Sequence, residues 1–361
     1  MERNYGIELL RIIAMFFIVI HHIIGQGGAM ESLSSNSPQF QIGSIFYIIS
    51  CCAVNIYALI SGFVLCNKTL CLSRLTNLYF SIIFYTVSIY ILLILLGYES
   101  LSIGNVIRVV LPISSGHYWY LTSYFGLLLL MPFLNNALAI VQKRDIVVCS
   151  ILGFIFVCFL PTILRTDPFH TNSGLSTIWL CILYLVGGWL RKSDIISKMK
   201  FEWLAVLFVV MVLVTYFSKI IFLYIHDYYL IGEGSGVMFF HYTSPTMVIM
   251  AMTLFCLVVK KTFTPLLIKI IGTISPMTLS VYVIHENLMI RKHFFNHFAE
   301  CFADYNAVLY VCMIVFSAFI IYVSCSAIDY LRIYLFRLMK IKEFSNLIEV
   351  NVFDFLNKFE R

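Results

Sequence analysis

Charged residues are scarce in this chain of 361 residues: Asp, Glu, Lys and Arg together make up only 12% of it, whereas 61% of the residues are apolar. A soluble globular domain carries about twice that share of charge, so the composition excludes one. The sequence also lacks a Cys-x-x-Cys pair, an internal repeat and a low-complexity tract. The 11 cysteines are odd in number and lie mostly in apolar segments. We interpret them as small buried residues and not as a disulfide framework.

Long hydrophobic runs take the place of the missing charge. A membrane-spanning helix needs about 17 to 25 mostly apolar residues, and the sequence contains about ten such runs. We therefore predict an all-α polytopic membrane protein with about ten transmembrane helices. The predicted spans are 7–27, 42–66, 78–97, 117–134, 146–164, 175–190, 203–224, 244–259, 273–291 and 306–330.

The distribution of basic residues predicts the orientation. If both termini are cytoplasmic, 19 of the 24 Lys and Arg residues fall on the inner side, as the positive-inside rule requires. Residues 1–330 then form the transmembrane domain, and residues 331–361 form a cytoplasmic amphipathic tail on the inner membrane lipids. The net charge of +6 is ordinary for such a protein and does not indicate a nucleic-acid partner.

The first span holds ionisable residues that a lipid-facing helix avoids. Arg11 lies near its start, and His21 and His22 lie near its end. Eleven residues complete about three helical turns, so Arg11 and His22 share one face about 16 Å apart. Such residues usually face a bundle interior and mark a functional site. The alternative is that Arg11 anchors the helix at the interface and His22 satisfies a helix contact.

Similar residues recur at two depths of the predicted bundle. His22, His285 with Glu286, and His117 with Trp119 share the outer level, and Arg11 and Arg74 share the inner level. The alternatives are satisfied core histidines and, for Arg74, a positive-inside anchor. Arginine suits phosphate, and histidine serves as a general base near neutral pH. We infer that an anionic donor enters from the cytoplasm and meets an acceptor from outside, and a long thin donor such as a pantetheine thioester fits the separation.

Two further patterns carry less weight. His293, His297 and Cys301 are spaced like metal ligands, but no independent fourth ligand accompanies them, so we expect no metal. Residues His226, Asp227, Glu233 and His241 lie among glycines and are either an acceptor lid or a solvated flexible loop.

Several motifs, taken in order, resemble the acyltransferase-3 family of bacterial membrane O-acyltransferases. The family signature of Arg, ten residues and His appears here as Arg11 to His22. The second span contains NIYALISGFVL with Ser61-Gly62-Phe63, the fourth contains HYWYL and then MPFL, and the ninth contains LSVYVIHE with Tyr282-x-x-His285. The resemblance covers about residues 5 to 330.

This resemblance implies transfer of an acyl group, usually acetyl, from cytoplasmic acyl-CoA to a hydroxyl of an extracytoplasmic glycan or cell-surface polysaccharide. It assigns His22 as the catalytic histidine and Arg11 as a residue of the acyl-CoA channel, with acetyl-CoA as donor substrate. His285, Glu286, Trp119 and His117 are candidates for orienting the base or the acceptor, and Ser61 is a candidate relay nucleophile. The expected location is the bacterial cytoplasmic membrane.

The chain departs from the family pattern before the third span. Relatives often carry an Arg-Arg-x-x-Arg-like stretch there, whereas here only Arg74 remains, as a second candidate for binding the acyl-CoA phosphates. Many relatives also append a hydrolase-like domain. Because this sequence ends about thirty residues after the tenth predicted span, we expect a stand-alone member. The alternative function is a secondary transporter or flippase for a glycan or lipid-linked precursor, in which the buried Arg and His bind substrate or relay protons.

Overall fold

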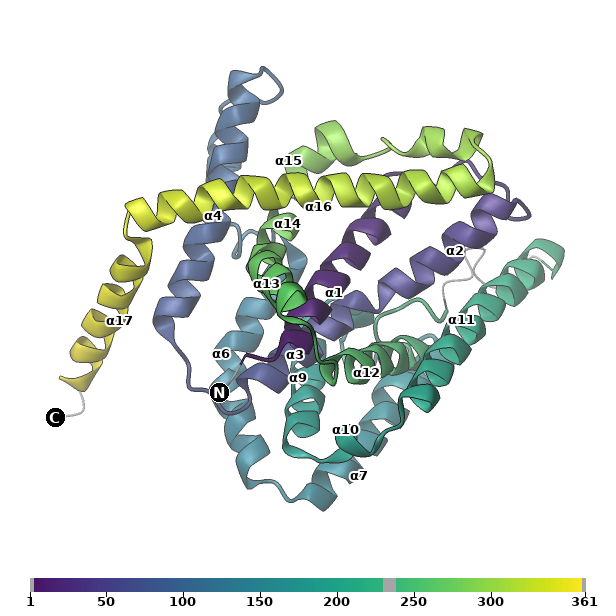
Figure 1. Cartoon of the computed structure of the whole chain (residues 1–361), viewed down its shortest axis with the longest axis horizontal. Helices are drawn as coiled ribbons and strands as arrows, with labels where there is room; N and C mark the ends of the chain where they lie inside the picture. Colours follow the sequence, from purple (N-terminus) through teal and green to yellow (C-terminus); the bar gives the residue numbers. More distant parts are fainter. Residues whose placement is uncertain (1–2, 230–237, 359–361) are drawn as a thin grey trace.

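The computed structural model describes residues 3–229 and 238–358, and within these ranges all of its regular secondary structure is helical (Figure 1). The longer helices are α1 (Tyr5–Ile24), α2 (Pro38–Cys51), α3 (Ala53–Leu65), α4 (Leu72–Leu95), α6 (Trp119–Ile140), α7 (Lys143–Gly153), α9 (Thr177–Lys192), α11 (Phe201–Tyr229), α12 (Pro245–Val259), α13 (Pro265–Ile274), α16 (Ala307–Leu338) and α17 (Ile341–Asn357). The shorter ones are α5 (Ile103–Val110), α8 (Leu160–Leu164), α10 (Ile195–Lys198), α14 (Thr278–His285) and α15 (Leu288–Ile290).

Eight stretches of the described residues are long and apolar enough to cross a membrane. They coincide with eight of the ten predicted spans; α2 with α3, α7 with α8, and α13 with α14 each form one of them. The other two predicted spans, 175–190 and 244–259, fold as α9 and α12, with 16 and 15 residues. At 1.5 Å per residue such helices reach only about 22 to 24 Å, short of the ~30 Å hydrocarbon core. The structure thus supports eight candidate spans where we predicted about ten.

Helix α1 lies in the interior of the bundle and contacts α2, α3, α12, α13, α14 and α16. Asn4 caps its start: the Asn4 side chain accepts a hydrogen bond from the backbone N–H of Ile7 and so satisfies one of the free donors of the first turn. Its buried face includes Leu10, Ala14 and Val19. The central position of α1 means that side chains projecting from it meet several other helices.

Proline breaks the span that faces α1. Pro276 lies between α13 and α14, in a single 3₁₀ turn over Ser275–Met277, because proline lacks the N–H that an α-helix would use there. Helix α14 then ends at His285, and the chain bends through Glu286 and Asn287 into α15. Both irregular points lie against α1, so polar groups collect where this span is not a regular helix.

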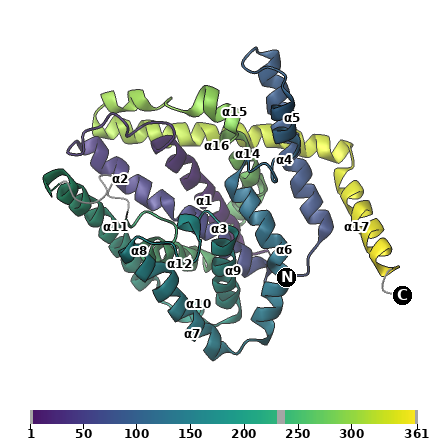
Figure 2. The same cartoon turned by 180° about the vertical axis from the view of Figure 1, so that it is seen from behind.

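The last two helices frame one side of the molecule. Figures 1 and 2 show α16 as a long rod that crosses the bundle, and α17 turning away from its end to run beside α4. The turn between them is at Lys340, which has a left-handed backbone (φ 53°). Helix α16 runs on to Leu338, so the first part of the segment predicted as a tail continues this helix.

Candidate active site

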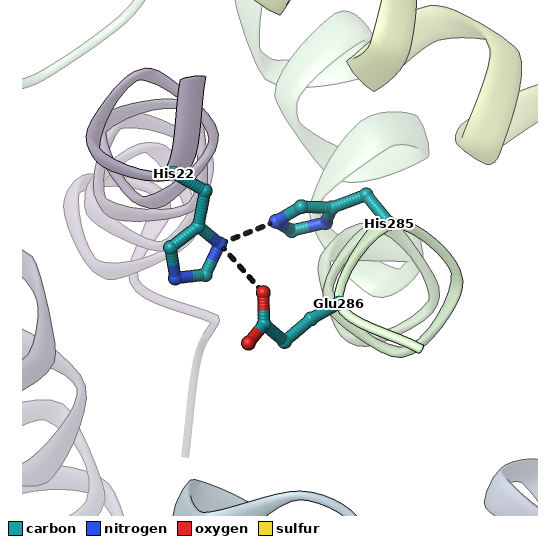
Figure 3. Close-up of side chains that lie close together, drawn as sticks. All are labelled: His22, His285 and Glu286. Carbon is teal, nitrogen blue, oxygen red and sulfur yellow. Dashed lines mark hydrogen bonds and ion pairs between the residues drawn. The ribbon is translucent and has the colours of Figure 1, made fainter. Parts of the chain in front are cut away.

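Three ionisable side chains meet where α1 and α14 end. The His22 Nδ1 atom lies 2.9 Å from Nε2 of His285 and 3.1 Å from Oε2 of Glu286 (Figure 3). All three are largely buried: His285 is 2% exposed and Glu286 5% exposed, and the His22 side chain is 13% exposed. The residues come from segments more than 260 positions apart in the sequence. The sequence predicted only a common depth for these residues, and the structure places them in direct contact.

Hydrogen bonding fixes the tautomers of this pair. The Nδ1 atom of His285 lies 2.5 Å from the carbonyl oxygen of Val281, and a carbonyl only accepts, so this Nδ1 carries the proton. The Nε2 atom of a neutral His285 is then an acceptor, and His22 donates to it from Nδ1. The Nε2 atom of His22 is left with a free lone pair. This is the form that a general base requires.

An arginine completes the cluster. Nη1 of Arg291 lies 2.7 Å from Oε1 of Glu286, so the buried carboxylate has a positive partner. Sequence reasoning placed Arg291 at the outer end of a span but did not pair it. The two residues are five apart, a spacing that does not bring side chains together on a regular helix. They meet because α14 ends at His285.

A cavity of about 330 Å³ lies beside this cluster. His22 and Arg11 both line it, as do the predicted residues Trp119 and Ser61. His285 and Glu286 do not line it and support His22 from behind. Further lining residues are His21, Ser50, Tyr57, Tyr120, Tyr124, Tyr242, Ser275, Thr278 and Tyr282. Because Arg11 and His22 both line it, this cavity connects the inner and the outer polar levels that the sequence predicts.

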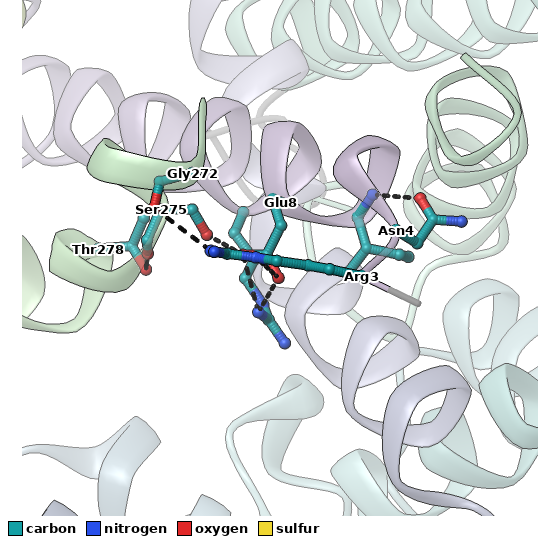
Figure 4. Close-up of polar contacts among 8 residues, drawn as sticks. Arg3, Asn4, Glu8, Gly272, Ser275 and Thr278 are labelled. Atoms are coloured by element: carbon teal, nitrogen blue, oxygen red, sulfur yellow. Dashed lines mark hydrogen bonds and ion pairs between the residues drawn. The ribbon is translucent and has the colours of Figure 1, made fainter. Parts of the chain in front are cut away.

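Arg11 is held by a carboxylate at the other end of α1. Its Nη1 atom lies 3.1 Å from both oxygens of Glu8, and Glu8 also contacts Arg3 at 3.4 Å and accepts a hydrogen bond from the Ser275 hydroxyl (Figure 4). Glu8 is 9% exposed, whereas the Arg11 side chain keeps 30% of its surface. Our sequence reasoning missed Glu8, although its i, i+3 spacing from Arg11 is a recognisable signal.

The remaining predicted residues differ in position. Trp119 lines the cavity and stacks on Tyr242, with ring centroids 6.1 Å apart. The Ser61 hydroxyl donates to the Tyr57 carbonyl oxygen at 2.8 Å. His117 is buried against Tyr118 without lining the cavity, and neither of its ring nitrogens has a hydrogen-bond partner among the described residues. Arg74 is exposed and does not line the cavity.

His21 has a place that the sequence did not specify. It lines the cavity, and its ring stacks on Tyr47 with centroids 4.2 Å apart and an interplanar angle of 12°. Of the four residues considered as an acceptor lid, Glu233 lies outside the described residues, together with the glycines around it. His241 is described and lines a separate small cavity near Arg165.

The cluster also has donor atoms of the kind that bind metals. One ligand atom each from His22, His285 and Glu286 lies within 4.8 Å of the others. The hydrogen bonds and the Arg291 ion pair described above account for this arrangement, and a guanidinium beside Glu286 opposes a further cation by like-charge repulsion. The absence of a required metal stays a prediction.

Comparison with known proteins gives one clear result. A family model described as an acyltransferase domain, acyltransferase 3, matches residues 4–327. No curated protein and no solved structure is significantly similar to the chain. The matched region includes α1 with Arg11 and His22, the whole cavity and the His285–Glu286 pair. Because the match covers most of the sequence and the described residues contain eight candidate membrane spans, the chain belongs to the acyltransferase-3 family and is a membrane acyltransferase.

Proposed function

We propose that this protein transfers an acetyl group from cytoplasmic acetyl-CoA to a hydroxyl of an extracytoplasmic glycan, in the cytoplasmic membrane of a bacterium. The observation that carries the proposal is the single cavity lined by Arg11 near the start of α1 and by His22 near its end. The two residues lie about 16 Å apart along the helix. A donor whose phosphates and thioester are separated by a pantetheine arm suits such a site.

The donor side of the proposal rests on Arg11. A guanidinium presents a rigid fork of donors that matches phosphate oxygens, and Glu8 fixes its position from one side only. The face of Arg11 turned toward the cavity remains for the donor. Arg74, at the start of α4, is proposed as a second phosphate contact outside the cavity.

The proposed chemistry uses the free lone pair of His22. Its Nε2 atom takes the proton from the acceptor hydroxyl as that oxygen attacks the thioester carbonyl carbon. The C–O bond forms, the C–S bond of the tetrahedral intermediate breaks, and the departing CoA thiolate takes the proton from the imidazolium. Glu286 stabilises the transient charge on the ring. Each transfer thus returns His22 to its starting form.

A neighbouring hydroxyl suits the oxyanion. The Tyr282 hydroxyl is buried, has no hydrogen-bond partner among the described residues, and belongs to a residue that lines the cavity. A buried donor aimed at developing negative charge is an effective catalytic group. Trp119 is proposed to position the acceptor, whereas His117 does not line the cavity and has no direct contact to offer it. A Ser61 relay is less favoured, because its hydroxyl already donates to Tyr57.

The proposed topology has both termini in the cytoplasm. We propose that α9 and α12 complete a set of ten crossing helices, although each is short. Both pack against α3, and most of their residues are buried or half-buried.

The first experiment measures CoA release and transfer of labelled acetyl to bacterial cell-surface polysaccharide by purified protein in detergent. We expect His22→Ala to lose about 10²–10⁴-fold in kcat and Arg11→Ala to raise KM for acetyl-CoA. His297→Ala is the matched control, because this histidine is 60% exposed on the surface and its loss leaves both parameters unchanged. A His22→Ala variant with wild-type kcat contradicts the mechanism. A wild-type protein that neither binds nor turns over acetyl-CoA contradicts the donor.

A further inference from the structure

A second cavity, of about 280 Å³, lies between α2 and α11. Most of its lining residues are polar and include Asn36, Gln41, Ser44, Tyr216 and Lys219. Lys219 and Ser44 lie at the same end of the bundle as His22. Ser44 is near the start of α2, which follows the end of α1 where His22 lies, and the Lys219 Nζ donates to the Ser44 hydroxyl. Lys219 is also about 27 Å along α11 from its start. No role in the proposed reaction has been assigned to this cavity.

Lys219 is the unusual residue in it. Its ammonium is part of a side chain only 8% exposed, donates to the Ser44 hydroxyl at 2.9 Å, and lies 4.5 Å from the Phe40 ring centroid and 5.4 Å from that of Phe240. Among the residues whose side chains are described, 3–226 and 238–358, no carboxylate lies within ion-pair distance of it. Aromatic faces and one hydroxyl offset only part of the cost of burying a charge. An anion in the cavity would supply the missing partner.

The polar groups around Lys219 are already oriented. The Tyr216 hydroxyl donates to Oε1 of Gln41 at 2.7 Å, and Nε2 of Gln41 donates to the Ser35 carbonyl oxygen at 2.6 Å. These bonds fix the amide at the cavity wall without using the lysine. A cation beside neutral hydrogen-bonding groups and aromatic rings suits a ligand with one negative group and several hydroxyls.

The two cavities are close neighbours. The Phe240 ring that contacts Lys219 also lies 5.9 Å, centroid to centroid, from Tyr47, and Tyr47 stacks on His21 in the catalytic cavity. The Cys51 thiol donates to the Phe240 carbonyl oxygen and fixes this wall. A ligand held by Lys219 is therefore separated by two aromatic rings from His21, the neighbour of His22 in the sequence.

We propose that the Lys219 cavity is a subsite for the acidic group of the acceptor, a carboxylate or phosphate carried by a sugar. This inference rests on the proposed function, because it takes the acceptor to be a glycan that reaches His22 from this end of the bundle. It makes an acidic polysaccharide, and not a neutral one, the acceptor class. The shared anionic chemistry also occurs in lipid headgroups, which the experiment must distinguish.

The test measures binding and not turnover, by calorimetry on the full-length protein in a neutral detergent without acetyl-CoA. The probes are D-glucuronate and glucose 1-phosphate, with D-glucose as the uncharged control. We expect Lys219→Met to weaken binding of the anionic probes about tenfold or more, and Lys219→Arg to retain it. Lys219→Gln replaces the methionine variant if that one is not monodisperse. Lys261→Met is the matched control, because Lys261 lies 4.1 Å from the Phe201 ring but lines no part of this cavity.

Three outcomes overturn the inference: anionic probes that bind Lys219→Met and wild type equally, D-glucose that binds as tightly as glucuronate, and failure of all the probes to bind. In a further arm, nanodiscs with and without phosphatidylglycerol are compared. If the lipid displaces glucuronate in a Lys219-dependent way, the cavity is a lipid site and the acceptor assignment fails. The same titration in His22→Ala separates the two proposals, because this substitution removes the proposed general base but leaves the lining of the Lys219 cavity unchanged. Lys219-dependent binding without CoA release in wild type contradicts the proposed function alone.

Discussion

At the scale of single residues, the candidate site depends on a chain of hydrogen bonds that starts at a backbone carbonyl. Val281 determines which nitrogen of His285 is protonated, His285 determines the same for His22, and the Nε2 atom of His22 is thereby left free. Glu286 contributes through charge, because it faces His22 on one side and Arg291 on the other. We therefore propose His285 and Glu286 as positioning residues, because His22 alone of these three lines the cavity.

The first prediction concerns Glu286→Gln. The amide keeps the size of the side chain but removes the negative charge that stabilises the His22 imidazolium, while His285 still selects the tautomer. We expect kcat to fall about 10- to 100-fold, less than the ~10⁴-fold loss seen when a catalytic histidine takes the wrong tautomer, with KM for acetyl-CoA unchanged. Steady-state kinetics of CoA release measure both. Glu300→Gln is the control, because Glu300 pairs with the exposed His297. An effect confined to KM would contradict the positioning role.

Some of the site was predictable because it follows from helix periodicity. Arg11 and His22 share a helical face, and counting along the spans placed His285 and Glu286 at the depth of His22. The ion pair of Glu286 with Arg291 was not predictable, since it depends on where α14 ends. The same holds for the Lys219 cavity, because it depends on α2 and α11 lying side by side.

At the scale of elements, α3 and α9 form the closest helix contact near the cavity. A Cβ atom on Gly62 would collide with the Tyr184 carbonyl oxygen, and one on Gly187 would collide with the Leu59 carbonyl oxygen. Small residues allow helices to approach this closely in a membrane. The Ser61-Gly62 step thus places Ser61 on the cavity side and backbone contact on the other.

The second prediction follows from this contact. Gly62→Ala forces α3 away from α9, and we expect it to destabilise the protein by about 1–3 kcal/mol, seen as a lower midpoint of thermal unfolding in detergent. Gly104→Ala is the control. Gly104 is also helical, but nothing lies within 4 Å of a Cβ atom placed there. Equal midpoints for the two variants would show that α3 and α9 can separate without cost.

The element boundaries show where sequence reasoning fails. Hydrophobic runs located the eight candidate spans found in the described part of the chain, because burial in a membrane requires long apolar helices whatever their neighbours. The runs 175–190 and 244–259 are apolar like the other eight, but they fold as the shorter helices α9 and α12, which pack on α3. A helix surrounded by protein is as apolar as one in lipid, so composition alone does not tell them apart.

At the scale of the whole molecule, α16 connects α1 and α14, which carry His22 and His285, to α4. Asp329 of α16 is fully buried and accepts hydrogen bonds from the Tyr85 hydroxyl of α4 at 2.5 Å and from Nε of Arg332 at 2.6 Å. Helix α16 also contacts α1 and α14, which carry His22 and His285. Displacement of α16 from α4 would therefore disturb the packing around both histidines.

The third prediction is that Asp329→Asn destabilises the molecule by about 3–5 kcal/mol, because it leaves the Arg332 guanidinium without its buried counter-charge. Thermal unfolding measures the loss. Asp304→Asn, at the end of a 3₁₀ turn that precedes α16, is the control. An Asp329→Asn midpoint equal to that of wild type would show that the α4–α16 contact does not depend on this ion pair.

Helix α17 is attached to α4 by a carboxylate. No side chain caps α4 from its own N-cap residue, Cys71; instead, Oε1 of Glu349 accepts a hydrogen bond from the backbone N–H of Leu72 at 2.8 Å. The first turn of a helix has free N–H groups and a positive dipole end, which favour an anion. Hydrogen bonds from the Ser73 hydroxyl and from the backbone hold the pKa of Glu349 below its ordinary value of 4.5.

The fourth prediction is the pH dependence of this attachment. A carboxylate whose pKa is lowered in the docked state contributes its stabilisation fully above pH 4.5 and loses it as the pH falls through the lower docked value. We expect hydrogen exchange in residues 341–357, corrected for the intrinsic rate, to be slow at neutral pH and to accelerate below pH 4.5. Glu349→Gln should exchange fast at every pH, whereas the control Glu343→Gln on the same helix should follow wild type. Equal protection of Glu349→Gln and wild type at neutral pH would mean that apolar contacts alone hold α17 on α4.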